Sequence, residues 1–325
     1  MKTISRRQFL KRTALASMVG VATLTGVNET AQAAVEPMAT VIDLTKCDGC
    51  KGEPVPSCVL ECKNKNQSRY PQPKKPILDY WPRKGYEDWS DKQQLTNRLT
   101  PYNWLYVQKV TVNGKTVYIP RRCMHCENPP CAKLCPFSAF TVYKDSSVTI
   151  DPDVCFGGAK CRDVCPWGIP ARQAGVGVYM KLAPTYGGGG VMYKCDMCHD
   201  LVENGQQPVC VNVCPRQAMT FGSKSAMKRL ANERKHSVNG YLYGLTENGG
   251  TATYYISPVP FADIHSALQA TGEVDGKPGR AGMPPVASKM DEFRNLSAAM
   301  LVAPIAGMFA AGWSAWRTMK KEGKE

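Results

Sequence analysis

Cysteine is the residue type in this sequence whose spacing most clearly indicates chemistry. The chain has 325 residues, of which 15 are cysteines. All of them fall in four runs, and the last three runs end in Cys-Pro. Thiolates spaced two or three residues apart and closed by proline are typical ligands of ferredoxin-type iron–sulfur clusters, in which the last cysteine of a run binds the neighbouring cluster. The sequence therefore predicts an electron-transfer protein.

Two other uses of cysteine compete with this interpretation. Disulfides persist in exported proteins, but 15 is an odd number and would leave one thiol unpaired. Paired Cys-x-x-Cys motifs can hold zinc, but zinc explains neither the repeated Cys-Pro ending nor the three-residue step before it. We therefore interpret the four runs as iron–sulfur ligands.

The crossover of the last cysteine divides the fifteen residues into four sets. Three sets contain four cysteines each and predict [4Fe–4S] clusters. The remaining set has only three, because Gly158 stands where the third run should have its second cysteine. The predicted sets are Cys47, Cys50, Cys58 and Cys214; Cys62, Cys195, Cys198 and Cys210; Cys123, Cys126, Cys131 and Cys165; and Cys135, Cys155 and Cys161.

Gly158 has no side chain that could bind iron. We therefore expect a [3Fe–4S] cluster at the incomplete set, and three [4Fe–4S] clusters at the others. The alternative is a [4Fe–4S] cluster whose fourth iron binds water or an outside ligand, since the nearest carboxylate, Asp163, lies off the required position. His125 and His199 lie within the cysteine runs, and we interpret them as neighbours that tune a cluster by hydrogen bonding rather than as ligands.

Short strand-like segments beside the runs predict the elements that must position the cysteines. Residues 140–143 and 147–151 predict a strand pair, so residues 123–166 form an inner two-cluster unit. Residues 40–43 and 218–222 offer comparable strands for a second unit built from the first and fourth runs. The predicted fold class is α+β, with two nested double-cluster ferredoxin-like units that carry insertions.

The domain organisation follows from these units. The four-cluster domain is expected to span residues 34–235. Within it, residues 63–122 form an insertion rich in aromatic residues and proline, in which Asn113-Gly114 predicts a hairpin. Prolines and glycines in residues 236–294 predict an extended arm rather than a third compact domain.

Both ends of the chain carry predicted address signals. Residues 1–33 contain a twin arginine, an apolar stretch and a small-residue cleavage site, and they resemble a Tat signal peptide. Residues 295–317 predict a transmembrane helix, because 21 of them in a row carry no charge and about 20 apolar residues span a bilayer. The basic tail at residues 318–325 predicts a cytoplasmic C-terminus and a body at the periplasmic face of the inner membrane. Small residues in the span predict a membrane partner subunit.

The formal net charge of +14 does not indicate a nucleic-acid partner. Without the two predicted terminal segments, 32 lysines and arginines face 24 acidic residues. Four clusters, each with a formal charge of about −2 including its thiolates, would offset nearly all of this excess.

The four runs, the prolines that close three of them, and the hexapeptide YKCDMC at residues 193–198 resemble the four-cluster electron-transfer (beta) subunits of periplasmic respiratory complexes. With its Tat signal, its membrane anchor and the segment TYYI at residues 253–256, the chain is most similar to the iron–sulfur subunit of hydrogenase-2-type complexes. The resemblance implies a relay between a periplasmic catalytic subunit, a [NiFe] hydrogenase, and a quinone-reactive membrane subunit in contact with lipid. It implies no catalytic residue in this chain.

Gly158 departs from the hydrogenase-2-type pattern, which generally keeps sixteen cysteines. Nitrate-reductase-type beta subunits make a replacement at this position and hold a [3Fe–4S] cluster near the membrane subunit. The beta subunit of a formate dehydrogenase or another molybdoenzyme is therefore an alternative. A self-contained oxidoreductase is an alternative of another class, but the sequence contains neither a glycine-rich nucleotide fingerprint nor spare cysteines for nickel.

Overall fold

The computed structural model of the protein describes residues 36–79, 86–182, 188–274 and 278–295, together with Trp313. The predicted signal peptide (residues 1–33), nearly all of the predicted membrane helix (residues 295–317) and the predicted tail (residues 318–325) lie outside these residues. Within the described part of the chain, no helix is both long and apolar enough to cross a membrane.

The described chain has the mixed helix and strand content that the sequence predicts, in mostly short elements. In chain order these are β1 (Met38–Asp43), α2 (Ser57–Asn66), η1 (Gln67–Arg69), η2 (Ser90–Lys92), β2 (Tyr106–Val112), β3 (Lys115–Arg121), α3 (Pro130–Lys133), β4 (Phe140–Val142), β5 (Val148–Ile150), α4 (Lys160–Asp163), β6 (Ala171–Gln173), α5 (Val178–Leu182), β7 (Val191–Tyr193), α6 (His199–Val202), α7 (Val209–Asn212), β8 (Met219–Ser223), α8 (Lys224–Ser237), β9 (Tyr241–Tyr243), η3 (Glu247–Gly249), β10 (Thr253–Ser257) and α9 (Phe261–Ala270).

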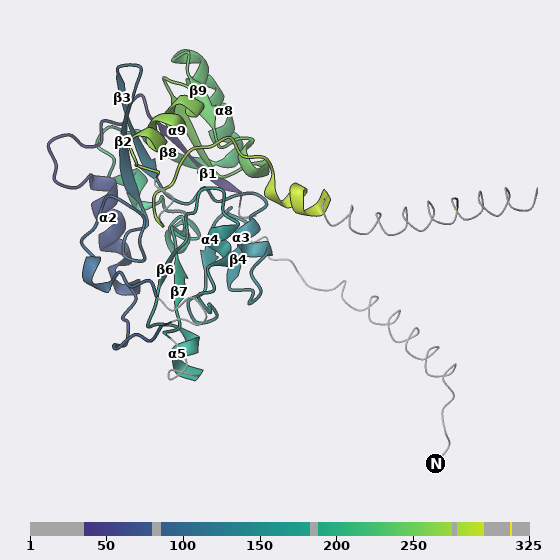
Figure 1. Ribbon diagram of the computed structural model, residues 1–325. Helices are drawn as coiled ribbons and strands as arrows, with labels where there is room; N and C mark the ends of the chain where they lie inside the picture. The colour runs from purple at the N-terminus through teal and green to yellow at the C-terminus, as the bar shows by residue number, and fades with distance from the viewer. Residues whose placement is uncertain (1–35, 80–85, 183–187, 275–277, 296–312, 314–325) are drawn as a thin grey trace, which may run out of the picture. The chain divides into compact units, whose positions relative to one another are not determined.

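The largest sheet has four strands in the order β8, β1, β10, β9 (Figure 1). Strand β1 pairs antiparallel with β8 and parallel with β10, while β9 is antiparallel to β10. The β-branched residues Thr40, Val41 and Ile42 suit a strand that is buried on both faces. Because side chains alternate along a strand, Val41 packs in the cluster beneath α8 and Ile42 packs in the main core, which contains cysteines.

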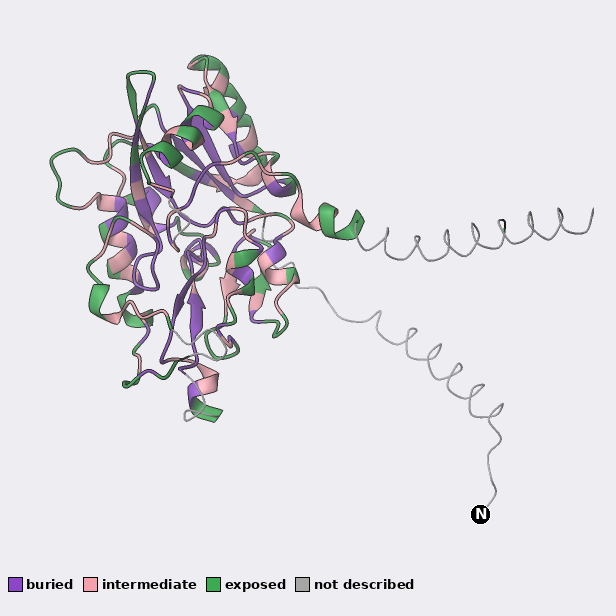
Figure 2. Ribbon diagram, in the orientation of Figure 1, coloured by how far each residue is buried: buried purple, intermediate pink, exposed green. Residues whose placement is uncertain are grey.

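Helix α8 covers one face of this sheet and leaves its outer side to solvent (Figure 2). Its N-cap residue, Ser223, accepts a hydrogen bond from the Ala226 backbone N–H at 3.4 Å. Met227 and Ala231, one helical turn apart, are its buried residues. Basic residues in its last turn lie near the negative end of the helix dipole.

The hairpin predicted around Asn113-Gly114 is formed by β2 and β3, which pair antiparallel. Asn113 and Gly114 have φ angles of 49° and 75°, as a two-residue type I′ turn requires. Strand β3 ends at Arg121, two residues before the first cysteine of the second run. The second run therefore begins directly after a paired strand, which fixes the position of its first cysteine.

The short helices pair the cysteine runs as first with fourth and second with third. Helix α2, which carries cysteines of the first run, packs on α7 from the fourth run, and β1 pairs with β8. Helix α3 from the second run packs on α4 from the third, and β4 pairs with β5 between them. The first-and-fourth pair thus encloses the second-and-third pair along the sequence.

Residues 236–294 differ from the extended arm that their composition predicts. They contain β9, β10 and α9, and every residue of β10 is buried. Thr253 pairs in register with Thr40, so β10 completes the sheet between β1 and β9. Prolines and glycines mark only the turns of this segment, and the strand and helix between them pack on the four-cluster domain.

Truncation of a β10 side chain tests this integration. Ile256 is fully buried in the cluster beneath α8. We expect Ile256→Ala to lower the free energy of unfolding by about 2–5 kcal/mol, because it leaves a cavity in the core. Anaerobic urea unfolding followed by circular dichroism measures the loss.

Leu182→Ala is the matched control, because Leu182 in α5 is 71% exposed. Its urea midpoint should stay near that of the unmodified protein. Equal midpoints for the two variants would show that β10 contributes no more to the core than an exposed residue does.

Candidate metal centres

The predicted ligand sets define four candidate sites, which are numbered 1 to 4. The structure places every one of the fifteen residues, and all are free of disulfides. Following the predicted ligand sets, the cysteines are grouped as site 1 (Cys47, Cys50, Cys58, Cys214), site 2 (Cys62, Cys195, Cys198, Cys210), site 3 (Cys123, Cys126, Cys131, Cys165) and site 4 (Cys135, Cys155, Cys161).

Site 3 is an apolar cavity whose lining contains all four of its predicted cysteines. Cys123 and Cys126 follow β3, and Cys131 lies on α3. Cys165 comes from the third run, just beyond α4. Trp167, which is 4% exposed, lines the same cavity and helps to exclude water from it. The cavity therefore brings together three cysteines of one run and the last cysteine of its partner run.

Site 1 repeats this arrangement with the outer runs. A cavity is lined by all four predicted cysteines and by apolar residues that include Val107 and Met219. Cys47 and Cys50 follow β1, Cys58 lies on α2, and Cys214 follows α7. The crossing cysteine again comes from the end of the partner run.

Site 2 lies between α2 and the fourth run. Its four cysteines are all buried. Burial raises the pKa of the Cys62 thiol well above its ordinary value, and the negative charges of Cys195, Cys210 and Cys198 raise it further. A thiolate at Cys62 is therefore close enough to the other three to be repelled by them.

Site 4 has three cysteines in a smaller apolar cluster with Val191 and Met192. The Cys155 sulfur accepts hydrogen bonds from the backbone N–H groups of Gly157 and Met192, both at 3.4 Å. Burial, together with the charges of Cys155, Cys165 and Cys135, raises the pKa of Cys161 to about 12.

The loops of the four runs share one backbone feature. Two residues after the first cysteine, each run has a residue with positive φ: Gly49 at 70°, His125 at 49°, Gly157 at 66° and Met197 at 63°. This conformation turns the chain back toward the first sulfur, as the bond from the Met197 N–H to Cys195 Sγ at 3.4 Å shows. The third run therefore keeps this turn of a complete run.

Gly158 occupies the position that Cys50, Cys126 and Cys198 hold in the other loops, three residues after the first cysteine. It is exposed, and its φ lies outside the left-handed region. Apart from Gly158 itself and its two neighbours in the chain, no described atom lies within 4 Å of the place where a Cβ would stand. The backbone would thus accept a cysteine, and only the side chain is missing.

Adjacent sites follow one another in a fixed order. A charge at Cys210 of site 2 acts on Cys58 of site 1, where burial is the larger cause of the raised pKa. Burial also raises the pKa of Cys195 in site 2, to about 11, and a charge at Cys123 of site 3 adds to the shift. Cys165 of site 3 acts in the same way on Cys161 of site 4. The sites therefore form the series 1, 2, 3, 4.

The donor set suits iron–sulfur clusters. Among the described residues, no group of His, Cys, Asp and Glu is arranged to hold a single metal ion; in sites 1 and 3 the sulfurs line a cavity instead. Burial raises the pKa of Cys47 and Cys165 to about 11, so the folded chain alone disfavours their thiolates. A bound metal reverses this, because a coordinating thiol is deprotonated outright.

Two buried basic residues also suit anionic clusters. Arg122 is 1% exposed, and its Nη1 lies 3.9 Å from Cys195 Sγ. Lys194 is buried beside site 3 and donates to the backbone carbonyls of Val148 and Cys195. Neither forms a salt bridge with a described residue, and a buried charge without a counter-charge is costly. Sequence reasoning missed both, although each directly precedes the first cysteine of a run.

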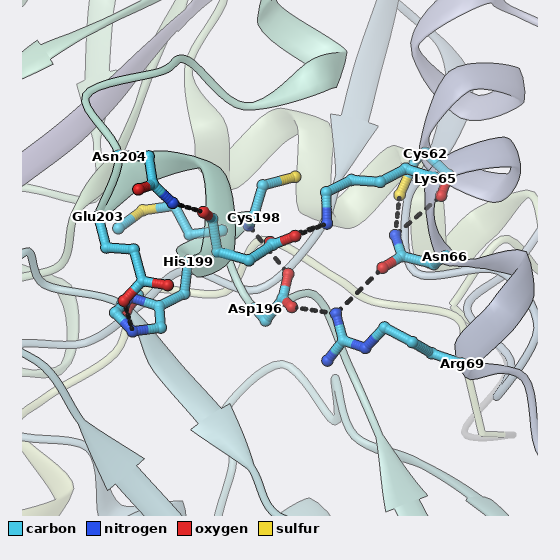
Figure 3. Close-up of polar contacts among 12 residues, drawn as sticks. Cys62, Lys65, Asn66, Arg69, Asp196, Cys198, His199, Glu203 and Asn204 are labelled. Carbon is cyan, nitrogen blue, oxygen red and sulfur yellow. Dashed lines mark hydrogen bonds and ion pairs between the residues drawn. The ribbon is translucent and has the colours of Figure 1, made fainter.

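A polar network fixes site 2 against α2 (Figure 3). The Asn66 side-chain amide lies 3.7 Å from Cys62 Sγ, and its oxygen accepts from Arg69 at 3.2 Å. Arg69 pairs in turn with Asp196, which accepts from the Cys198 backbone N–H at 2.9 Å. Burial would raise the pKa of Asp196, but Arg69, the Cys198 backbone N–H and Lys65 together hold that pKa below its ordinary value. The anionic carboxylate therefore ties the first run to the fourth.

Comparison with known proteins identifies the same regions. Residues 114–224 match the family described as the 4Fe-4S dicluster domain, and residues 46–139 match a second family of that description. Together the two matches cover all four cysteine runs. Two dicluster domains imply that the chain holds iron–sulfur clusters.

The chain is similar to subunits of several oxidoreductase complexes. It is 32% identical over 241 residues to the formate dehydrogenase-O iron-sulfur subunit of Escherichia coli K12, across 68% of this chain and 67% of the relative. It is 31% identical over 188 residues to the B subunit of anaerobic dimethyl sulfoxide reductase from the same strain, across 58% and 74%. It is 28% identical over 306 residues to the hydrogenase-2 operon protein HybA of Escherichia coli O157:H7, across 80% and 83%.

The chain spans about two thirds of the length of the formate dehydrogenase-O subunit. The two cavities lined by cysteine sulfurs, the two dicluster matches and these identities agree with one another. The chain belongs to the family of iron–sulfur electron-transfer subunits that includes those of formate dehydrogenase-O and anaerobic dimethyl sulfoxide reductase.

Proposed function

We propose that this chain relays electrons between a periplasmic catalytic subunit and a quinone-reactive membrane subunit, through clusters at sites 1, 2, 3 and 4 in that order. The observation that carries the proposal is the series of neighbouring cysteine sets. Helix α2 carries Cys58 of site 1 and Cys62 of site 2. His125 in the site 3 loop lies 3.8 Å from Cys195 of site 2, and Cys165 of site 3 follows α4, which carries Cys161 of site 4. An unbroken series is what a relay requires, because a gap would interrupt electron flow.

In this proposal, sites 1, 2 and 3 each hold a [4Fe–4S] cluster with four cysteine ligands, and site 4 holds a [3Fe–4S] cluster with three. The clusters, when bound, supply the one-electron redox chemistry. The residues of the chain hold the clusters, exclude water from them and place donors and cations beside their sulfurs. We assign site 4 to the membrane end of the series.

The proposed catalytic partner is a [NiFe] hydrogenase. Similarity to HybA supports it, because that alignment extends over 80% of the chain, against 68% for the formate dehydrogenase-O subunit. The higher identity to the formate dehydrogenase-O subunit, 32% against 28%, supports a formate dehydrogenase as the second candidate. The proposed location is the periplasmic face of the inner membrane, with export by the Tat signal and one C-terminal membrane helix.

Co-purification tests the relay. An affinity tag on this chain, with mild detergent extraction of the membrane, should recover a catalytic subunit and a membrane subunit that mass spectrometry identifies. The complex should pass electrons from substrate to a quinone, and the isolated chain should not turn over substrate. A chain that purifies alone and reduces a substrate by itself would contradict the proposal.

Replacement of the missing ligand tests site 4. The oxidised protein should show the EPR signal of a three-iron cluster, and Gly158→Cys should remove it and add one iron atom per chain. The reason is that the loop already has the turn of a complete run and leaves room for the thiolate. Quantitative EPR and iron analysis provide the measurement.

Gly158→Ser is the control for that replacement, because it adds a side chain of similar size without the thiolate. It should keep the three-iron signal. Absence of that signal in the unmodified protein would favour a four-iron cluster with an outside ligand at this site.

Substitution of the twin arginine tests the export proposal. The combined change Arg6→Lys and Arg7→Lys should leave the chain in the cytoplasm, because the Tat pathway requires the arginine pair. Cell fractionation and immunoblotting measure the distribution. Arg12→Lys, a like change in the same segment, should export normally; normal export of the double variant would rule out the Tat assignment.

A further inference from the structure

We propose that His125 acts on the site next to its own: its backbone belongs to the loop of site 3, while its side chain donates a hydrogen bond to Cys195 of site 2 and raises the reduction potential of the cluster there. The proposal rests on the proposed function, since it requires clusters at both sites. It differs from the sequence interpretation, in which the imidazole tunes a cluster from within a run.

The direction of the imidazole follows from its two nitrogen contacts. His125 is 1% exposed, so its ring has no access to bulk water. The Val148 backbone N–H donates to Nδ1 at 3.0 Å, which means that Nδ1 carries no proton. The proton of the neutral ring is therefore on Nε2, and Nε2 lies 3.8 Å from Cys195 Sγ. The remaining N–H thus points at a sulfur of site 2.

The backbone of the second run enforces this crossing. His125 has a φ of 49°, the left-handed conformation that turns each loop back toward its first sulfur. Such a conformation is uncommon for residues with a side chain, although histidine adopts it more often than most, as asparagine and aspartate do. In the first and third runs the same position is glycine, with no side chain to direct. The second run places there an imidazole that reaches beyond its own site.

A second donor from the same segment points to the same sulfur. Arg122 Nη1 lies 3.9 Å from Cys195 Sγ, while its Nε and Nη2 have no hydrogen-bond partner among the described residues. Cys195 Sγ also accepts from the Met197 backbone N–H. Three donors, two of them from side chains, therefore converge on one ligand of site 2.

The other sites are less well supplied with side-chain donors. Asn248 donates to Cys126 of site 3 at 3.2 Å, and Ser57 lies 3.8 Å from Cys50 of site 1. At site 4, the hydrogen bonds to Cys155 from described residues come from backbone N–H groups. The segment that supplies two ligands of site 3 thus also supplies two side-chain donors to one sulfur of site 2.

The effect on potential follows from charge. A reduced cluster carries one more negative charge than the oxidised cluster, so a donor N–H stabilises the reduced state more. Because His125 and Cys195 are buried, solvent does not screen the interaction. Removal of the N–H should therefore lower the reduction potential of site 2, and it should leave the ligands of both sites in place.

The test compares His125→Leu with His125→Gln in the complete complex. Leucine removes the donor, whereas glutamine keeps a side-chain N–H of similar reach, and both residues face the same backbone cost at positive φ. In an EPR-monitored redox titration, the ratio of reduced to oxidised site 2 cluster at the wild-type midpoint should fall about tenfold in the leucine variant, which is about 59 mV for a one-electron couple. The glutamine variant should recover most of the shift.

Two marker variants assign the EPR components to sites. Asn66→Asp replaces the donor to Cys62 of site 2, and Asn248→Asp replaces the donor to Cys126 of site 3. Both changes keep the size of the side chain. They also keep the acceptor oxygen, which binds Arg69 at residue 66 and the Lys289 backbone N–H at residue 248. Each marker should lower the potential of a different component.

The leucine variant should shift the component that Asn66→Asp marks. A shift of the Asn248 component instead, no shift of either, or equal behaviour of leucine and glutamine would overturn the proposal. If the leucine variant assembles without a full set of clusters, a second measurement decides: pulsed EPR of the unmodified complex that contains ring-¹⁵N histidine. Coupling of a histidine nitrogen to the component that Asn66→Asp marks supports the proposal. Absence of that coupling overturns it. Failure of the proposed function would appear differently, as missing cluster signals in the unmodified complex.

Discussion

The fold depends on a charge constraint: cysteine sulfurs and basic side chains share an interior from which water is excluded. Burial raises the pKa of the thiols, while Arg122 and Lys194 are buried without a carboxylate partner among the described residues. Each kind of group is costly alone. An anionic cluster held by thiolates removes both costs, since iron keeps the sulfurs deprotonated and the cluster attracts the basic groups.

The same constraint joins cofactor binding to folding. Sulfurs of sites 1, 2 and 3 belong to the main hydrophobic core together with Leu105, Ile119 and Tyr255, so the sites are not attached to a core that exists without them. Metal-binding free energy is folding free energy where a site is absent from the unfolded chain. Loss of one cluster should therefore loosen the packing around it as well as interrupt the series.

Much of the site arrangement could be predicted from the sequence because ligand spacing reflects local geometry. The structure gathers the expected four at sites 1 and 3, and Asn113-Gly114 forms the expected turn. Features that depend on contacts distant in sequence could not be predicted in the same way. The side chain of His125 contacts Cys195, 70 residues further along the chain, and Asn66 and Arg122 carry no motif of their own. Residues 236–294 were predicted as an arm because turn residues dominate their composition, while β10 becomes a strand by pairing with β1.

That pairing has a consequence for how the chain folds during synthesis. Strand β1 lies near the start of the described chain, but both of its neighbours, β8 and β10, come from the last third of the sequence. Thr40 pairs with Thr253, so the centre of the sheet cannot form until more than two hundred further residues have left the ribosome. Contacts so distant in sequence also make folding slow. The elements of this sheet therefore cannot fold in the order in which they are synthesised. Strand β1 stays without its partner strands until most of the chain has been made.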